Sequence, residues 1–111
     1  MAKLGEYGDK LQTMTAQEAF DAAATHLLEQ GCRSESDGRC RYNGDGVCCA
    51  AAPFIRNYSP ELEDIDWLSV VRRKAASKNH LDLIEKLQRI HDSTSPKMWY
   101  ECLEYLATKS I

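Results

Sequence analysis

The segment 31–58 constrains the fold more than any other part of the chain, because its composition differs from that of the segments around it. It reads GCRSESDGRCRYNGDGVCCAAAPFIRNY and holds four of the five cysteines and four of the six glycines. Short apolar and aromatic runs separated by glycine-containing turns are typical of β-hairpins. Because apolar residues recur at helical spacing elsewhere in the chain, we expect one hairpin that packs against helices.

The register of this hairpin follows from which side chains it would bury. If Gly44 and Asp45 form a two-residue turn, one face carries four uncharged side chains and the other carries Arg41 and Cys48. The uncharged face consists of Cys40, Tyr42, Val47 and Cys49. A turn at Asn43 and Gly44 would instead place Asp45 on the buried face, which is unfavourable for a carboxylate. We therefore favour the first register, with the arginines facing water.

Helix signals occur on both sides of the hairpin segment. Thr15 and Glu18 form a capping box, apolar residues follow at helical spacing, and Gly31 suits the left-handed residue after a helix end. These signals predict a helix over about 16–30. Further caps predict a short turn over 60–63 and helices over about 66–76, from about 79 to 90 and from about 96 onward.

The predicted fold class is α+β and mostly α, with four to five helices packed around one β-hairpin. Trp67 and Trp99 lie on apolar helix faces and are expected in the core. With 111 residues, the chain has the length of one ordinary domain. We expect residues 15–111 to form a single globular domain. Residues 1–14, with two glycines and mixed charges, are expected to form a loose arm.

Charge and cysteine content narrow the class of protein. The formal net charge is −3, which argues against a nucleic-acid-binding protein because phosphate contacts need a positively charged face. No apolar run approaches the ~20 residues that span a bilayer, and no secretory signal is recognisable. An odd number of cysteines without such a signal favours reduced thiols. We therefore expect a cytoplasmic protein with no membrane partner.

Polar side chains in and just after the hairpin form the candidate ligand-binding site. They are Arg39, Arg41, Asn43, Arg56 and Tyr58. Planar guanidinium groups suit phosphates and carboxylates, so these residues could bind a phosphorylated ligand. The same pattern fits a simpler interpretation, in which the charges of an exposed strand edge prevent pairing with other chains.

The cysteines and histidines offer two alternatives, catalysis and zinc binding. Cys48 could pair with a histidine as a thiolate nucleophile. The histidines are His26, His80 and His91. A zinc ion could be held by one histidine and three cysteines that converge in space, although the paired ligand spacing of zinc sites is missing. Those cysteines are Cys32, Cys40 and Cys49. Because no motif has a catalytic geometry, we favour a non-catalytic protein with no cofactor and no metal.

Several motifs resemble a family of small proteins that is common in phages and prophages. The family pattern is a helix ending in L-x-x-Q-G, then C-x-Y-x-G, a D-G turn and a cysteine-alanine segment, followed by L-Q-x-x-H-D and a tryptophan. The matching positions are Leu28, Gln30, Gly31, Cys40, Tyr42, Gly44, Asp45, Gly46, Cys49, Ala50, Ile55, Tyr58, His91, Asp92 and Trp99. The chain departs from the pattern at Pro53 and Phe54, where the family has cysteine and leucine. It also has Arg56 and Asn57 in place of an acidic run.

The resemblance implies an accessory protein that acts in the cytoplasm of a bacterial host. We expect a phage-type, non-catalytic binder, used against host defence or in host takeover, that inhibits a host protein or sequesters a small phosphorylated (nucleotide) signal. A sequestering protein would be a symmetric homo-oligomer, whereas an inhibitor of a protein would carry an exposed apolar or acidic patch. The alternatives are a small enzyme that uses Cys48 or Cys49 with a histidine, and a structural or regulatory phage component with a zinc site.

Overall fold

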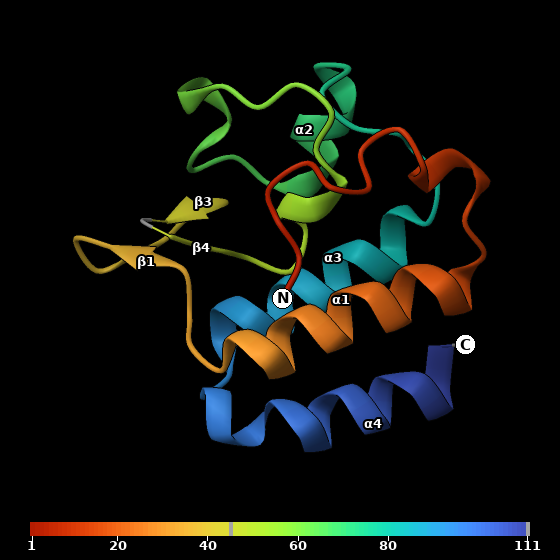
Figure 1. Cartoon of the computed structure of the whole chain (residues 1–111), viewed down its shortest axis with the longest axis vertical. Helices are drawn as coiled ribbons and strands as arrows, with labels where there is room; N and C mark the ends of the chain where they lie inside the picture. Colours follow the sequence, from red (N-terminus) through yellow and green to blue (C-terminus); the bar gives the residue numbers. More distant parts are fainter. Residues whose placement is uncertain (45, 111) are drawn as a thin grey trace.

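The computed structural model describes residues 1–44 and 46–110 and is α+β, mostly α, as the sequence predicts. The α-helices are α1 (Ala16–Gln30), α2 (Trp67–Arg72), α3 (Leu81–Ser93) and α4 (Trp99–Ser110). The strands are β1 (Glu35–Ser36), β2 (Arg39–Cys40), β3 (Asn43–Gly44) and β4 (Val47–Cys48), and short 3-10 helices lie at Leu11–Thr13, Ala52–Phe54, Pro60–Leu62 and Pro96–Met98. In Figure 1, α1, α3 and α4 pack against one another, and the strands, α2 and the N-terminal segment lie on one side of them. Within the described residues, no helix has the length and apolar character needed to cross a membrane.

The first helix forms where the sequence predicts it. Thr15 Oγ1 accepts a hydrogen bond from Glu18 N–H (3.1 Å), and Glu18 Oε1 accepts one from Thr15 N–H (2.8 Å), so the capping box is complete. Gly31 follows the last turn with a φ of 69°, a left-handed conformation that glycine adopts at low cost. The buried face of α1 contacts both α3 and α4, which fixes the three-helix layer.

Two hairpins replace the single hairpin predicted from the sequence. In the first, Ser36 pairs with Arg39 across Asp37 and Gly38, which have φ angles of 54° and 76°. No turn was predicted from the sequence at these residues, because the single expected hairpin was placed further along the chain. Asp-Gly favours such a turn because both central residues need a positive φ, which aspartate tolerates and glycine adopts freely.

The second hairpin has a different register from the expected one. Gly44 pairs with Val47, so the turn follows Gly44 and does not include it. Asp45, which the prediction placed in the turn, lies outside the described residues. The glycine after it has a φ of 79°, the conformation for which a glycine is best suited. Tyr42 therefore faces Cys49, whose N–H donates to the Tyr42 carbonyl (3.3 Å), and both side chains are buried as expected.

Two cysteines lie where the predicted register did not place them. Cys48 was expected on the outward face but is 4% exposed. Its backbone N–H and C=O each bond to the Gln30 side chain at 3.0 Å, which holds this residue against α1. Cys40 was expected to face Cys49, but it belongs to the first hairpin and lies opposite Glu35.

Polar side chains of the helices hold the backbone of both hairpins. Besides Gln30, Gln88 Oε1 accepts a hydrogen bond from Ala51 N–H (2.9 Å). His91 Nε2 accepts a hydrogen bond from Ser34 N–H (2.9 Å). Two-stranded hairpins are marginal in water and leave backbone groups unpaired, so these bonds supply what a neighbouring strand provides in a larger sheet. They fix both hairpins relative to α1 and α3.

The segment 1–14, which we expected to be a loose arm, packs against the chain that follows the hairpins. Tyr7 N–H donates to the Pro53 carbonyl (2.7 Å). Leu11 is fully buried in the core. Burial of this leucine and the backbone bonds offset the entropy cost of ordering a glycine-containing segment.

Both tryptophans are in the core, as their positions on apolar helix faces predict. Trp67 is 2% exposed and Trp99 is fully buried. The helix that carries Trp67 is shorter than predicted, because Lys74 takes a left-handed φ of 64°. The chain turns there, and Ala76 forms a β-bridge with Ile55.

Candidate functional site

Three of the five residues predicted to bind a ligand lie around one carboxylate. Glu63 accepts hydrogen bonds from the backbone N–H groups of Tyr42 (2.9 Å) and Asn43 (3.1 Å). It also accepts one from the Tyr58 hydroxyl (2.6 Å). Burial, followed by the bond to Glu63, raises the pKa of Tyr58 to about 12, although the nearby charge of Arg41 lowers it. Glu63 and Arg41 therefore act on the pKa of this tyrosine in opposite directions.

The other two predicted residues are placed by different contacts. Arg39 forms an ion pair with Asp64 (3.3 Å), and both side chains are exposed to water. Arg56 is also exposed, and its backbone N–H donates to the Ala75 carbonyl (2.6 Å). Neither contact links these arginines to the group around Glu63.

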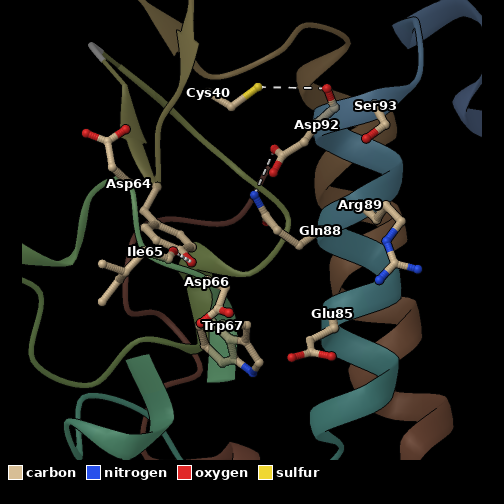
Figure 2. A pocket seen from close by; sticks show the side chains of 11 residues that line it. Cys40, Asp64, Ile65, Asp66, Trp67, Glu85, Gln88, Arg89, Asp92 and Ser93 are labelled. Atoms are coloured by element: carbon tan, nitrogen blue, oxygen red, sulfur yellow. Dashed lines mark hydrogen bonds between the residues drawn. The ribbon is translucent and has the colours of Figure 1, made fainter. Parts of the chain in front are cut away.

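A cleft of about 520 Å³ lies between α3 and the segment that leads into α2 (Figure 2). Of the described residues that line it, four are acids and one is a base. The acids are Asp64, Asp66, Glu85 and Asp92, and the base is Arg89. Tyr42, Ile65 and Trp67 also line the cleft. It therefore combines apolar surface with an excess of negative charge.

Local structure places these acids on two opposite walls. Asp66 caps α2 by accepting a hydrogen bond from Ser69 N–H (2.9 Å), and hydrogen bonds from Ser69 lower the pKa of this carboxyl. Asp64 lies just before the cap and has a φ of 67°. Glu85 and Asp92 are about two turns apart on α3, so they project from the same helix face. All four acids therefore border one space, although they come from two elements.

Glu85 differs from the other three acids of the cleft in its contacts. Asp92 Oδ1 accepts hydrogen bonds from Gln88 Nε2 (2.9 Å) and from His91 Nδ1 (2.7 Å). The two acids of the opposite wall bond to the arginine and the serine described above. In the part of the chain that the structure describes, the Glu85 carboxylate forms no hydrogen bond or ion pair. Its carboxylate points into the cleft (Figure 2).

Trp67 contributes a second unsatisfied group. Its side chain is 2% exposed, and its Nε1–H has no acceptor among the described residues. In Figure 2 the indole nitrogen lies on the side of the ring that faces α3 and Glu85. A buried donor without an acceptor costs about 1–3 kcal/mol, and an acceptor that reached this nitrogen after a shift of the ring would relieve that cost.

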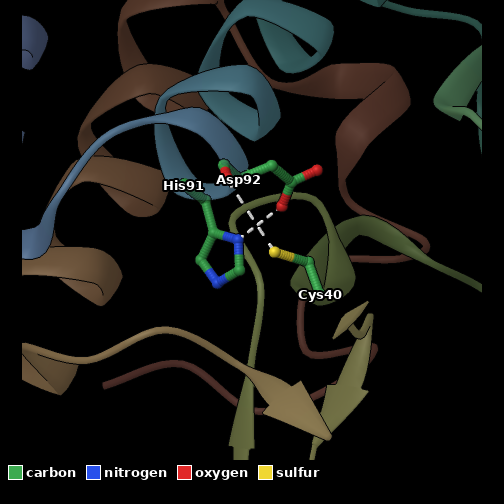
Figure 3. Close-up of side chains that lie close together, drawn as sticks. All are labelled: Cys40, His91 and Asp92. Carbon is green, nitrogen blue, oxygen red and sulfur yellow. Dashed lines mark hydrogen bonds and ion pairs between the residues drawn. The ribbon is translucent and has the colours of Figure 1, made fainter. Parts of the chain in front are cut away.

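Cys40, His91 and Asp92 lie close together beside the cleft (Figure 3), with potential metal-ligand atoms within 4.8 Å of one another. Both ring nitrogens of His91 are engaged, however. Nε2 accepts the Ser34 N–H, so the neutral ring carries its proton on Nδ1 and donates it to Asp92. Burial, followed by the charge of Asp92, raises the pKa of Cys40 to about 11. The cluster therefore fits a structural role better than a zinc site, which needs an unprotonated nitrogen and a thiolate.

Cys48 does lie beside a histidine, as the enzyme alternative requires: its Sγ is 3.5 Å from His26 Nε2. Ala2 N–H donates to His26 Nδ1 (3.1 Å), so the neutral ring carries its proton on Nε2 and donates it to the Cys48 carbonyl (2.9 Å). Burial lowers the pKa of His26 and raises that of Cys48 to about 11. Burial also raises the pKa of the Cys49 thiol. These shifts favour neutral side chains, the opposite of a thiolate–imidazolium pair.

The acidic cleft is the feature that sequence reasoning missed. Two signals for it were present, the capping position of Asp66 and the regular spacing of acids on one face of α3. Comparisons of the chain with models of protein families, with curated proteins and with solved structures found no match.

Proposed function

We propose that the protein is a non-catalytic binding protein that takes a basic segment of a partner protein into the cleft between α3 and the segment before α2. The observation that carries this proposal is the excess of acids around the cleft, four against one base. Lysine and arginine side chains are complementary to such a surface, since their stems cover apolar walls while their charged ends reach the carboxylates.

The same charges argue against the sequestration of a phosphorylated signal. A phosphate in the cleft would lie among carboxylates and would be repelled. Outside the cleft, Arg39 is already paired with Asp64, and Arg41 lies near Tyr58, whose hydroxyl donates to Glu63. We therefore favour the protein-binding form of the function that the sequence suggests.

The biological setting is the part of the proposal that rests on sequence resemblance. A phage-type accessory protein in the cytoplasm of a bacterial host would use such a cleft to inhibit a host or defence protein. Reduced cysteines are consistent with that compartment, and all five cysteines are free thiols.

Isothermal titration calorimetry tests the proposal with two sets of ligands. One is a blocked peptide of alternating basic residues and glycine, with an acidic peptide of equal length as its control. The other is a panel of cyclic and linear nucleotides. We expect saturable heat from the basic peptide alone, and weaker binding at higher salt because the charges are screened.

Matched variants locate the binding. Asp66→Asn removes a charge of the cleft but keeps a good helix cap, so the fold should be retained. Asp66→Asn should lower the affinity for the basic peptide several-fold, whereas Glu104→Gln, at an exposed position on α4, should leave the affinity unchanged. Heat from a nucleotide and none from the basic peptide would overturn the proposal in favour of sequestration.

A further inference from the structure

We infer that the cleft recognises an arginine side chain within a polypeptide, held by carboxylates of both walls and by the Trp67 indole N–H. The inference rests on the proposed function and names the chemical group that the cleft selects. Three observations on the two walls lead to it: the positions of the acids, the unpaired carboxylate of Glu85 and the unpaired indole.

The first observation is that carboxylates face one another across the cleft. Figure 2 shows Asp64 and Asp66 on one wall and Glu85 and Asp92 on the other. A guanidinium group is planar and has five N–H donors in a fixed fork, so it can bond to both walls at once. A lysine ammonium is a compact, strongly hydrated charge and suits this two-sided arrangement less well. Asp64 already pairs with Arg39 (3.3 Å), so an incoming guanidinium would share that carboxylate or bond to Asp66 on this wall.

The second observation is that Glu85 is free to bond. Asp92 is engaged by Gln88 and His91, but Glu85 has no partner among the described residues. Arg89, one turn further along α3, makes no ion pair with it there. An incoming guanidinium would therefore meet at Glu85 a carboxylate that does not have to give up an existing bond.

The third observation is the Trp67 N–H, which needs an acceptor. A guanidinium has no acceptor, so a free cation leaves this group unsatisfied. A peptide carbonyl beside the arginine side chain can accept from the indole once the ring shifts toward the cleft. Through this donor, the cleft distinguishes an arginine within a polypeptide from guanidinium itself and from polyamines.

The indole resonances of the ¹⁵N-labelled protein provide the test. Trp67 and Trp99 each give one N–H signal, and Trp99 serves as an internal reference because its Nε1–H already donates to the Thr94 carbonyl (3.1 Å). The ligands are Nα-acetyl-arginine methylamide, the lysine and citrulline equivalents, and guanidinium chloride at low concentration. Citrulline has nearly the shape of arginine without its charge. We expect the arginine ligand to shift the Trp67 signal to lower field and to leave that of Trp99 in place.

Two variants with the same change of charge separate the outcomes. Glu85→Gln should lower the affinity for the arginine ligand roughly tenfold, the usual effect of losing a hydrogen bond to a charged group. Glu104→Gln should leave this affinity unchanged. Equal binding of arginine and lysine, both dependent on Glu85, would overturn the choice of arginine but leave the proposed function standing. Binding of guanidinium as tight as that of the arginine ligand would overturn the role of Trp67. If no ligand binds, while the basic peptide still gives heat at another surface, the inference also fails.

Discussion

Replacing Glu63 with glutamine tests whether one carboxylate holds the start of the second hairpin in place. Its two oxygens serve different donors: Oε1 accepts from Tyr42 N–H (2.9 Å), and Oε2 accepts from Asn43 N–H (3.1 Å) and the Tyr58 hydroxyl (2.6 Å). A glutamine has one oxygen only. If that oxygen keeps the Asn43 and Tyr58 bonds, the amide NH₂ group faces the Tyr42 N–H, and two donors oppose each other.

The expected loss of stability follows from that count. One hydrogen bond to a charged group is lost and a partly buried backbone donor is left unsatisfied, which together cost about 2 kcal/mol. For a chain of 111 residues this corresponds to a fall in Tm of about 8 °C. Urea unfolding followed by circular dichroism measures the free energy directly. Glu61→Gln is the control, because it makes the same change of charge on an exposed residue of the same short turn and should stay within about 0.5 kcal/mol of the parent.

A second signal is specific to this carboxylate. The pKa of Tyr58, raised to about 12 by burial and then by Glu63, should fall in the Glu63→Gln protein. The fall should be partial because burial, the larger cause, remains. Ultraviolet absorbance during an alkaline titration would record it. A Glu63→Gln protein as stable as the Glu61→Gln control, with the tyrosine titration unchanged, would refute the reasoning.

Two further predictions concern the buried histidine and the N-terminal segment. Because burial lowers the pKa of His26, the unfolded chain binds this proton more readily than the folded protein. The stability that the neutral His26 contributes is therefore complete above the ordinary pKa of 6.5 and is lost as the pH falls toward the folded pKa. Between about pH 7.5 and about pH 5.5, the free energy of unfolding of the His26→Gln protein should fall less than that of the parent. Equal losses, measured by urea unfolding, would contradict this prediction. Gly8→Ala should destabilise by about 1–3 kcal/mol, since the added Cβ would lie 2.7 Å from the Ile55 carbonyl oxygen and 3.0 Å from Arg56 Cα. Asp9→Ala, on the exposed neighbour, should have little effect, and a Gly8→Ala protein of equal stability would show that this segment does not pack closely.

Local sequence signals predicted the elements that depend on neighbouring residues. Thr15, Glu18 and Gly31 act on the ends of their own helix, so α1 forms where they indicate. An Asp-Gly pair is the local signal for the first hairpin, because its turn needs a positive φ at both residues, which aspartate tolerates and glycine adopts freely. No turn was predicted at Asp37 and Gly38, which is why one hairpin was expected in place of two.

The cleft could not be predicted in the same way, because its two walls meet only after the chain folds. Asp66 could be recognised as a cap and Glu85 as part of a polar helix face, but no local pattern indicates that they lie opposite each other. The predicted arginines illustrate the same limit. Arg39 was correctly expected at the surface, but its pairing with Asp64 depends on the turn before α2.

The two glutamines that bond to the backbone in and after the hairpins determine which amino-acid substitutions this protein tolerates. Gln30 and Gln88 lie on helices, where polar residues are usually interchangeable. Here, however, the side chain of each one forms hydrogen bonds with the backbone of a residue that is distant in sequence, Cys48 for Gln30 and Ala51 for Gln88. At Gly38, in the tip of the first hairpin, a Cβ would meet no described atom within 4 Å, but the φ of 76° still favours glycine. A library of variants should therefore show strict requirements at Gln30 and Gln88, although both lie on helix surfaces, and at Gly38, although no described atom packs against it.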